Sequence, residues 1–308
     1  MKKNLLTLHD VSLKEIAHIF DLARKMKKNK GRFDHHLKGK TIALLFQKPS
    51  NRTRVSFEVG IWQLGGNCLY LGPDEIDLGK RESTSDVAKT LSRYLDGIVA
   101  RTHLHQDIVE LGKNATIPII NGLSDQFHPC QALTDIFSIQ EKFGTLKGIT
   151  LAYVGDGNNV CRSLMLGAAK VGLNMNIASP QGYEPADDIV EIIKPIAQKT
   201  KAKITITNSP QEAIRGAQVV YADVWVSMGQ EKESAERLKK FRDFQINSAL
   251  VKSADADYVF MHCLPAHRGF EVTTEVIDSP HSIIFEQAEN RLHVQKAILI
   301  FLYSNKKI

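Results

Sequence analysis

Short apolar runs alternate with stretches of helical periodicity along almost the whole chain. Parallel strands must be joined by long crossovers, which are usually helices, so this alternation is typical of parallel sheets covered by helices on both faces. We therefore predict an α/β fold with two doubly wound parallel sheets. The strands expected in the first sheet span 41–46, 67–71, 97–102 and 117–121, and those in the second span 149–154, 174–178, 203–207, 219–223 and 258–262.

Helices are expected between these strands, and two domains are the usual organisation for a chain of 308 residues. A Ser12-x-x-Glu15 capping box predicts the start of an opening helix. A long helix over 129–143, followed by Gly144, should link the two sheets. A further helix over 285–303 is predicted at the end of the chain.

Composition excludes several classes of protein. The formal net charge is +6, but the basic residues are dispersed, so no nucleic-acid partner is expected. No apolar stretch approaches the roughly 18 to 20 residues that cross a bilayer, and acidic residues interrupt the N-terminal segment where a secretory signal would lie. The cysteines lack any C-x-x-C pair, which disfavours a disulfide framework and a thiol-rich zinc site. We expect a cytoplasmic protein that does not contact a membrane.

Candidate functional residues follow the predicted strands, since ligands of open α/β sheets bind at the carboxyl ends of strands. The segment 48–54, Lys-Pro-Ser-Asn-Arg-Thr-Arg, stands between a strand and a predicted helix. Free backbone N–H groups, hydroxyls and two guanidinium groups would suit a phosphate there. An ordinary capped helix with two solvated arginines explains the same pattern equally well.

Two further candidates belong to the first sheet. Arg101 lies near the end of the strand over 97–102, and His128-Pro129-Cys130-Gln131 opens the linking helix. They offer a cation, an imidazole and an amide. A single histidine near a helix start is more often a structural hydrogen-bonding group than a catalyst, so these residues have to be judged together with the other motifs.

The second sheet has its own set of motifs. The turn over 155–159, Gly-Asp-Gly-Asn-Asn, lacks the G-x-G-x-x-G pattern of dinucleotide sites, which disfavours a nicotinamide cofactor, although the turn can still bind a small polar ligand. The segment Asp223-x-x-x-Ser227-Met228-Gly229 offers a carboxylate for an ammonium group, although a plain turn is the alternative.

The segment 262–269, His-Cys-Leu-Pro-Ala-His-Arg-Gly, contains two histidines and a cysteine, which suggests a zinc site. The lack of further suitably spaced ligands disfavours this interpretation.

Taken together, S-x-R-T-R from Ser50, H-P-C-Q, D-x-x-x-S-M-G, H-C-L-P-A-H-R-G and Q-A-E-N-R at 287–291 resemble the motifs of ornithine carbamoyltransferases. The resemblance extends over essentially the whole chain. Aspartate carbamoyltransferases are similar at the first motif, but they carry an H-P-L-P type segment in place of H-C-L-P and lack the S-M-G loop. The resemblance implies transfer of a carbamoyl group from carbamoyl phosphate to the side-chain amine of L-ornithine.

The resemblance also implies an organisation and a set of site residues. The carbamoyl phosphate domain would comprise 1–143 plus 286–308, with the last helix packing back on the first domain, and the ornithine domain would comprise 144–285. The implied carbamoyl phosphate site consists of Ser50, Asn51, Arg52, Thr53, Arg101, His128, Gln131, Cys263, Leu264 and Arg291. The implied ornithine site consists of Asn159, Asp223, Ser227 and Met228. Arg101, His128 and Cys263 would act in catalysis, without metal or cofactor, in a homotrimer or a multiple of trimers.

Two positions depart from the family pattern. Asn51 stands where relatives usually have threonine, so a hydroxyl contact is lost while the backbone N–H remains. Asp77 aligns where many relatives have glutamine or histidine, and a carboxylate beside phosphate would be repulsive. These departures keep open a catalytically silent subunit that binds or regulates a partner. A carbamoyltransferase for another amine such as putrescine is a second alternative, which Asp223 and the S-M-G segment disfavour because a diamine has no α-carboxylate to bind. A dinucleotide-dependent oxidoreductase is a more distant alternative.

Overall fold

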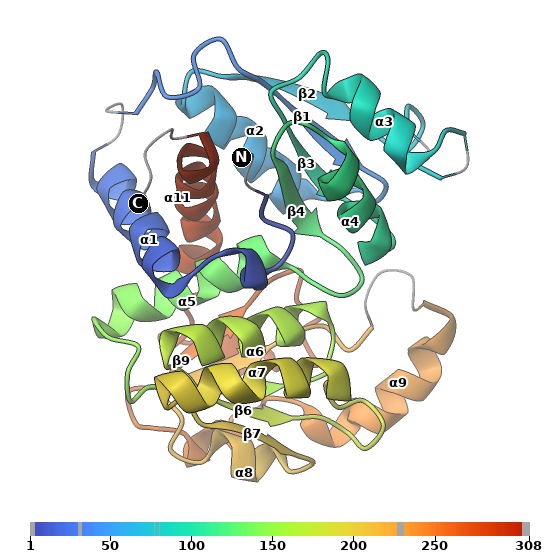
Figure 1. Cartoon of the computed structure of the whole chain (residues 1–308). Helices are drawn as coiled ribbons and strands as arrows, with labels where there is room; N and C mark the ends of the chain where they lie inside the picture. Colours follow the sequence, from blue (N-terminus) through green and yellow to red (C-terminus); the bar gives the residue numbers. More distant parts are fainter. Residues whose placement is uncertain (1–3, 30–32, 77, 80, 227–230, 304–308) are drawn as a thin grey trace. The chain divides into compact units, whose positions relative to one another are not determined.

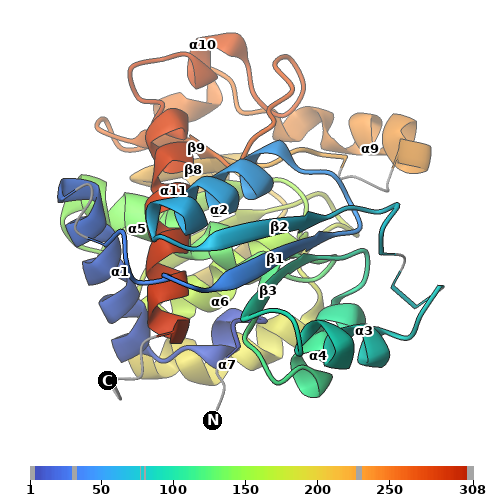
Figure 2. The ribbon, with the colours of Figure 1, turned by 90° about the horizontal axis from the view of Figure 1, so that it is seen from above.

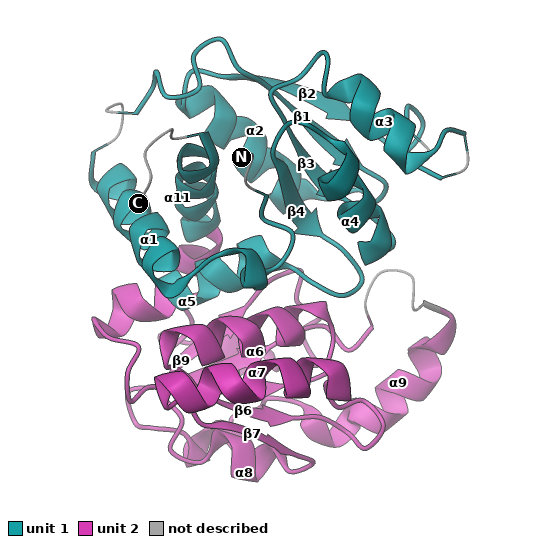
Figure 3. Ribbon diagram, viewed as in Figure 1, with its two compact units in different colours: residues 1–137, 289–308 teal, residues 138–288 magenta. Residues whose placement is uncertain are grey.

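The computed structural model describes residues 4–29, 33–76, 78–79, 81–226 and 231–303. The chain divides into two compact units, residues 1–137 with 289–308 and residues 138–288 (Figure 3). Both divisions fall inside helices, α5 (Pro129–Phe143) and α11 (Ile284–Tyr303), so each of these helices contributes to both units.

The first unit contains a four-stranded parallel sheet in the order β2-β1-β3-β4 (Figure 1). Its strands are β1 (Thr41–Phe46), β2 (Asn67–Leu71), β3 (Gly97–Arg101) and β4 (Ile119–Leu123). The predicted strands are confirmed, but β3 ends one residue early and β4 lies two residues later than expected. Pro118 has no N–H to give to a ladder, so β4 begins after it. The strand then continues through an irregularity that pairs Arg101 with Leu123.

Helices cover both faces of this sheet. They are α1 (Leu13–Lys28), α2 (Asn51–Gln63), α3 (Thr84–Leu91) and α4 (His105–Asn114), preceded by a short 3-10 helix, η1 (Leu8–Asp10). Figure 2 shows α3 and α4 on one side of the strands and α2 with α11 on the other. Buried side chains of β1, β3, α3 and α4 form one continuous apolar cluster, which includes Leu45, Ile98, Val87 and Leu111.

The last helix packs back on the first unit, as predicted. Lys296 of α11 donates to Gln63 of α2 at 2.8 Å. Tyr303 at the end of α11 donates its hydroxyl hydrogen to the backbone carbonyl of Asp96, at 2.6 Å. The ring of Phe301 lies 6.5 Å from that of His18 in α1. In the same part of α11, Arg291 lies at the start of α2, where it donates to the Thr53 hydroxyl at 2.9 Å.

The second unit contains a five-stranded parallel sheet in the order β7-β6-β5-β8-β9. Its strands are β5 (Thr150–Val154), β6 (Asn174–Ala178), β7 (Ile204–Thr207), β8 (Val219–Ala222) and β9 (Val259–His262). The predicted strands are again confirmed, with ends that differ by at most one residue. The helices are α6 (Asn159–Val171), α7 (Asp187–Thr200), α8 (Pro210–Ile214), α9 (Ser234–Phe241) and α10 (Thr274–Ile277), with 3-10 helices η2 (Glu231–Glu233), η3 (Arg242–Phe244) and η4 (Leu250–Ser253).

Each sheet has one point where the strand order reverses direction. In the first unit it lies between β1 and β3, and in the second between β5 and β8. The crossovers on the two sides of such a point leave in opposite directions, so the loops after its two strands separate and leave room for a ligand. The predicted motifs follow three of these four strands directly, and Arg101 ends the fourth, β3.

The capping box at the start of α1 generates a test of the fold. Ser12 accepts from the Glu15 N–H at 3.3 Å, while the Glu15 carboxylate accepts from the Ser12 N–H at 2.8 Å. We expect Ser12→Ala to lower the free energy of unfolding by about 1 kcal/mol in a urea titration, because a helix N–H loses its acceptor. Lys14→Ala, at an exposed position in the same helix, is the control. Equal stability of Ser12→Ala and the wild type would contradict the role of the cap.

Candidate functional site

The beginning of α2 supplies the first part of the site in the first unit. Ser50 has an extended backbone, with φ of −158° and ψ of 114°, and its hydroxyl accepts from the Thr53 N–H at 3.3 Å. Asn51 is exposed and Arg52 is half-buried. The first turn of a helix carries unpaired N–H groups and a partial positive charge. This end of α2 therefore favours an anion.

Three helices bring polar side chains together beside this helix start. Arg291 of α11 donates to the Thr53 hydroxyl of α2 at 2.9 Å and to the side-chain carbonyl of Gln131 of α5. Gln131 in turn donates to Asp135 at 2.8 Å. Arg291 and Thr53 are separated by 238 positions in the sequence, so their contact depends on α11 packing back on α2.

Arg101 adds a second buried guanidinium group to this cluster. Only 4% of its surface is exposed, and its Nε has no hydrogen-bond partner among the described residues. Burial lowers the pKa of Arg101 to about 10, and the positive charges of Arg291 and Arg52 add to the shift. An anion stabilises guanidinium groups that lie close together in a buried place, so this cluster is suited to an anionic ligand.

His128 lies next to the same cations. Its side chain is buried, and burial, followed by the charges of Arg291 and Arg101, holds its pKa well below the usual value. The imidazole is therefore neutral at pH 7. A neutral imidazole presents one N–H donor and one acceptor, so His128 can donate a hydrogen bond to an oxygen without carrying a charge.

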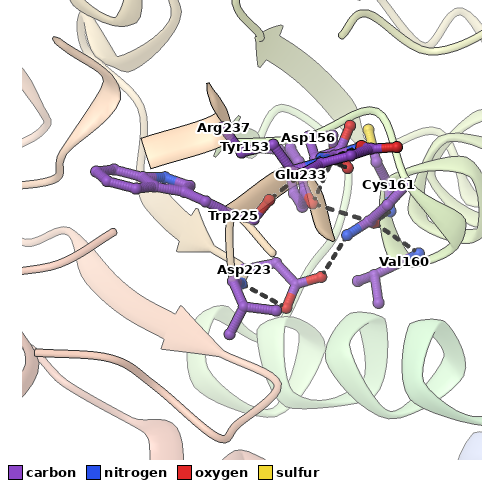
Figure 4. Close-up of polar contacts among 10 residues, drawn as sticks. Tyr153, Asp156, Val160, Cys161, Asp223, Trp225, Glu233 and Arg237 are labelled. Atoms are coloured by element: carbon purple, nitrogen blue, oxygen red, sulfur yellow. Dashed lines mark hydrogen bonds and ion pairs between the residues drawn. The ribbon is translucent and has the colours of Figure 1, made fainter. Parts of the chain in front are cut away.

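The second unit places a buried carboxylate at its own switch point (Figure 4). Asp223 follows β8 and is 4% exposed. Its carboxylate accepts from the Asn158 amide at 2.7 Å, the Cys263 thiol at 2.9 Å and the Val224 N–H at 2.8 Å. These donors fix the orientation of the carboxylate, which suits it to an ammonium group.

The turn after β5 forms the other side of this site. Asn158 caps α6 by accepting from the Val160 and Cys161 N–H groups at 3.0 and 3.2 Å. Asn159 is the first residue of α6 and is half-buried. A Cβ at Gly157 would lie 2.3 Å from the backbone nitrogen of Pro185, so only glycine fits this turn.

The H-C-L-P segment follows β9 in an unusual backbone conformation. Leu264 has a φ of 60°, in the left-handed region that is unfavourable for a leucine, and it is followed by a cis peptide bond to Pro265. The Leu264 N–H donates to His262 Nδ1 at 2.8 Å. His262 Nε2 lies 3.3 Å from the carboxylate of Glu271, and both side chains are buried. His262 thus stabilises the segment that carries Cys263.

Sequence reasoning singled out the turn over 155–159 but assigned no role to Asp156 or Asn158, and it did not identify Arg237. Asn158 could have been found from its position before a helix, where asparagine is a preferred cap. The pair of Asp156 with Arg237, 2.8 Å apart, has no signal in the sequence because the two residues are 81 positions apart. Predicted ligands Ser227 and Met228, as well as Asp77, lie outside the described residues.

The described residues form neither a metal-binding cluster nor a membrane-spanning helix. Their histidine, cysteine and acidic side chains nowhere gather in a group of three or more that could hold a metal ion. None of the helices formed by these residues has the length and apolar character needed to cross a membrane.

The fold and its two sites define an α/β protein of two units. One unit has a cluster of arginines suited to an anion, and the other has a buried carboxylate site. A family model for the carbamoyl-phosphate-binding domain of aspartate/ornithine carbamoyltransferases matches residues 3–141. A model for the aspartate/ornithine-binding domain matches residues 147–302. The chain belongs to the aspartate/ornithine carbamoyltransferase family, which confirms the resemblance inferred from its motifs.

Individual relatives extend over nearly the whole chain. The ornithine carbamoyltransferase of Anoxybacillus flavithermus is 52% identical over 302 residues, which cover 97% of this chain and 96% of the relative. That of Bacillus subtilis is 52% identical over 297 residues, covering 96% and 92%. Among solved structures, ornithine carbamoyltransferase from Pyrococcus furiosus is 49% identical with a TM-score of 0.96, covering 99% of this chain and 98% of that one. The Thermus thermophilus enzyme is 41% identical with a TM-score of 0.88, covering 99% and 100%.

The low pKa of His128 predicts a specific pH dependence of stability. As pH falls below about 6.5, the unfolded chain takes up a proton on this imidazole and the folded protein does not, so folding becomes less favourable. In His128→Asn, the slope of unfolding free energy between pH 7 and 5 should be shallower by up to about 1.4 kcal/mol per pH unit. Urea unfolding at a series of pH values measures this slope.

The matched control for that experiment is His36→Asn, which removes an exposed imidazole. Parallel curves for the wild type and His128→Asn would show that His128 takes up its proton equally well in the folded and unfolded states, and would overturn the electrostatic description of the anion site.

Proposed function

We propose that the protein transfers the carbamoyl group of carbamoyl phosphate to the side-chain amine of L-ornithine, giving L-citrulline and phosphate. The observation that carries this proposal is the gathering of Arg52, Arg101 and Arg291 around the start of α2. A dianionic acyl phosphate is the kind of ligand that such a cluster stabilises. The names of the relatives support ornithine as the acceptor, and the D-x-x-x-S-M-G segment supports an amino acid over a diamine such as putrescine.

The phosphate would be held mainly by the beginning of α2. Ser50 and Thr53 offer hydroxyl groups, Asn51 offers its backbone N–H, and Arg52 offers a guanidinium group. Because Asn51 lacks the hydroxyl that relatives usually have, its contribution is confined to the N–H. Arg291 completes the site, since it already contacts Thr53 at 2.9 Å.

The reaction is an acyl transfer. The neutral amine attacks the carbonyl carbon, a C–N bond forms, negative charge develops on the carbonyl oxygen, and the C–O bond to phosphate then breaks. Arg101, Thr53 and His128 would stabilise the developing oxyanion, because a neutral His128 can donate a hydrogen bond. Arg52 would offset the charge on the leaving phosphate, which can accept the proton that the amine loses.

The carbamoyl NH₂ group needs acceptors to orient it. Gln131, whose carbonyl accepts from Arg291, and the backbone carbonyls of Cys263 and Leu264 would supply them. The left-handed conformation of Leu264 is a backbone outlier of the kind found at functional sites.

Ornithine would be bound by the second unit. Asp223 would accept from its α-ammonium group, and Asn159, Ser227 and Met228 would bind its α-amino acid group. The side-chain amine has a solution pKa near 10, so the enzyme must select or create its neutral form. Cys263 would influence this step, and its hydrogen bond to Asp223 at 2.9 Å supports this role.

We further propose that the enzyme serves arginine biosynthesis in the cytoplasm, with the reverse, catabolic direction as the alternative, and that it assembles as a homotrimer or a multiple of trimers. Two observations support the proposal. The relatives described above are ornithine carbamoyltransferases, and the four cysteines, Cys68, Cys130, Cys161 and Cys263, form no disulfide, as expected in a reducing compartment.

The proposal is tested by incubating purified protein with carbamoyl phosphate and each of L-ornithine, putrescine, N-acetylornithine and aspartate, and measuring the carbamoylated product. We expect turnover with L-ornithine to exceed that with every other amine by at least 100-fold. Faster turnover with putrescine than with L-ornithine would mean that the acceptor of the carbamoyl group is another amine. Absence of turnover with all four would favour the silent-subunit alternative.

Substitution of Arg101 gives a sharper test of the anion site. Arg101→Ala removes a charged donor from the developing oxyanion, so kcat/KM should fall by about 100- to 1000-fold. Far-UV circular dichroism and the urea midpoint check that the fold is retained. Arg93→Ala, which removes a cation elsewhere in the first unit, should keep kcat/KM within about 2-fold, since surface charges act weakly. Wild-type turnover in Arg101→Ala would contradict its catalytic role.

A further inference from the structure

A buried ion pair lies beside the Asp223 site without belonging to it. Arg237 of α9 is 6% exposed, and its Nη1 lies 2.8 Å from the Asp156 carboxylate. The same guanidinium group donates to the Trp225 backbone carbonyl at 3.2 Å and to Glu233 at 3.0 Å. Figure 4 shows these side chains converging from the turn after β5, the segment after β8 and the region of α9.

The pair is connected to Asp223 along two routes. On one route, the Asp156 carbonyl accepts from the Tyr153 hydroxyl at 3.0 Å, and the same hydroxyl lies 3.3 Å from Asn158 Oδ1. Asn158 then donates to Asp223 at 2.7 Å. The other route is the backbone, because Trp225 is only two residues beyond Asp223. Arg237 therefore holds both segments that place the Asp223 carboxylate.

The charges make this arrangement depend on both partners. Burial raises the pKa of Asp156, and the nearby Asp223 raises it further, whereas Arg237 opposes both effects. Removal of Arg237 would leave two buried carboxylates, Asp156 and Asp223, without the positive charge that offsets their repulsion. Removing one partner of a buried ion pair is strongly destabilising. Without Arg237, the turn that carries Asp156 has to rearrange, or the Asp156 carboxylate has to take up a proton.

We propose that Arg237 and Asp156 form a positioning pair that sets the affinity of the second unit for the amino-acid substrate. The pair does this by fixing the Asp223 carboxylate and the turn that begins α6. The inference rests on the proposed function for the identity of that substrate.

The experiment compares Arg237→Gln, Asp156→Asn and the double variant with the wild type. Steady-state kinetics give KM for L-ornithine and for carbamoyl phosphate separately. We expect either single substitution to raise KM for L-ornithine at least 10-fold while KM for carbamoyl phosphate stays within 2-fold. The double variant should be no worse than the more impaired single variant, because the two side chains act as one unit.

The control is Arg162→Gln. Arg162 is a similarly buried arginine, 8% exposed, in a two-fold hydrogen-bonded pair with Asp188 at 2.7 and 2.8 Å, but this pair joins α6 to α7. A purely structural role for Arg237 predicts that both arginine variants lose stability and keep the same KM for L-ornithine. We expect Arg162→Gln to lose stability alone, with KM for L-ornithine within 2-fold of the wild type.

Several results would overturn the inference. They are an unchanged KM for L-ornithine in Arg237→Gln, an equal rise in KM for both substrates, and an equal rise in Arg162→Gln. If Arg237→Gln does not fold, Arg237→Lys retains the charge without the fork geometry and should still raise KM for L-ornithine. If the wild type shows no turnover, the proposed function fails, and the binding of L-norvaline measured by calorimetry tests the positioning pair separately. Weaker binding of L-norvaline by Arg237→Gln than by Arg162→Gln supports the positioning role. Equal binding by the two variants contradicts it.

Discussion

Mutual repulsion between buried guanidinium groups is the constraint on which the first unit depends. Arg101 and Arg291 are each 4% exposed, and together with Arg52 they lower the pKa of the neighbouring His128. Protein interiors rarely retain charged groups unless these are paired or hydrogen-bonded. Both the packing of α11 on α2 and the strand order that places β1 beside β3 bring these cations to one place. An anionic ligand at this place would offset these positive charges.

In the second unit, by contrast, the buried charged groups already have partners within the protein. Asp223 is already surrounded by three donors, and the carboxylate of Asp156 is paired with Arg237. Such a site is organised before the ligand arrives, so little reorganisation is needed when an ammonium group binds. Both units thus have a parallel sheet with a site at the point where the strand order reverses. The site of the first unit suits a strongly anionic ligand, and that of the second suits a small zwitterion.

Local patterns in the sequence predicted the strands, the capping box and the ends of α5, because burial periodicity and caps depend on neighbouring residues. Proline at 118 moved the start of β4, a local effect that apolar periodicity alone does not include. Contacts between distant segments were beyond this reasoning. The family resemblance placed Arg291 at the anion site, but its hydrogen bond to Thr53 spans 238 positions, and the pair of Arg237 with Asp156 spans 81.

The central claim is that one unit binds carbamoyl phosphate through its arginine cluster and the other binds the amino acid through Asp223. The most direct measurement is a crystal structure of the protein with carbamoyl phosphate and L-norvaline, which has ornithine's α-amino acid group but lacks the reactive amine. The account predicts phosphate oxygens within hydrogen-bonding distance of Arg52 and Arg101, and the α-ammonium group on Asp223. A phosphate bound away from these arginines, or an amino acid whose ammonium group does not contact Asp223, would contradict it.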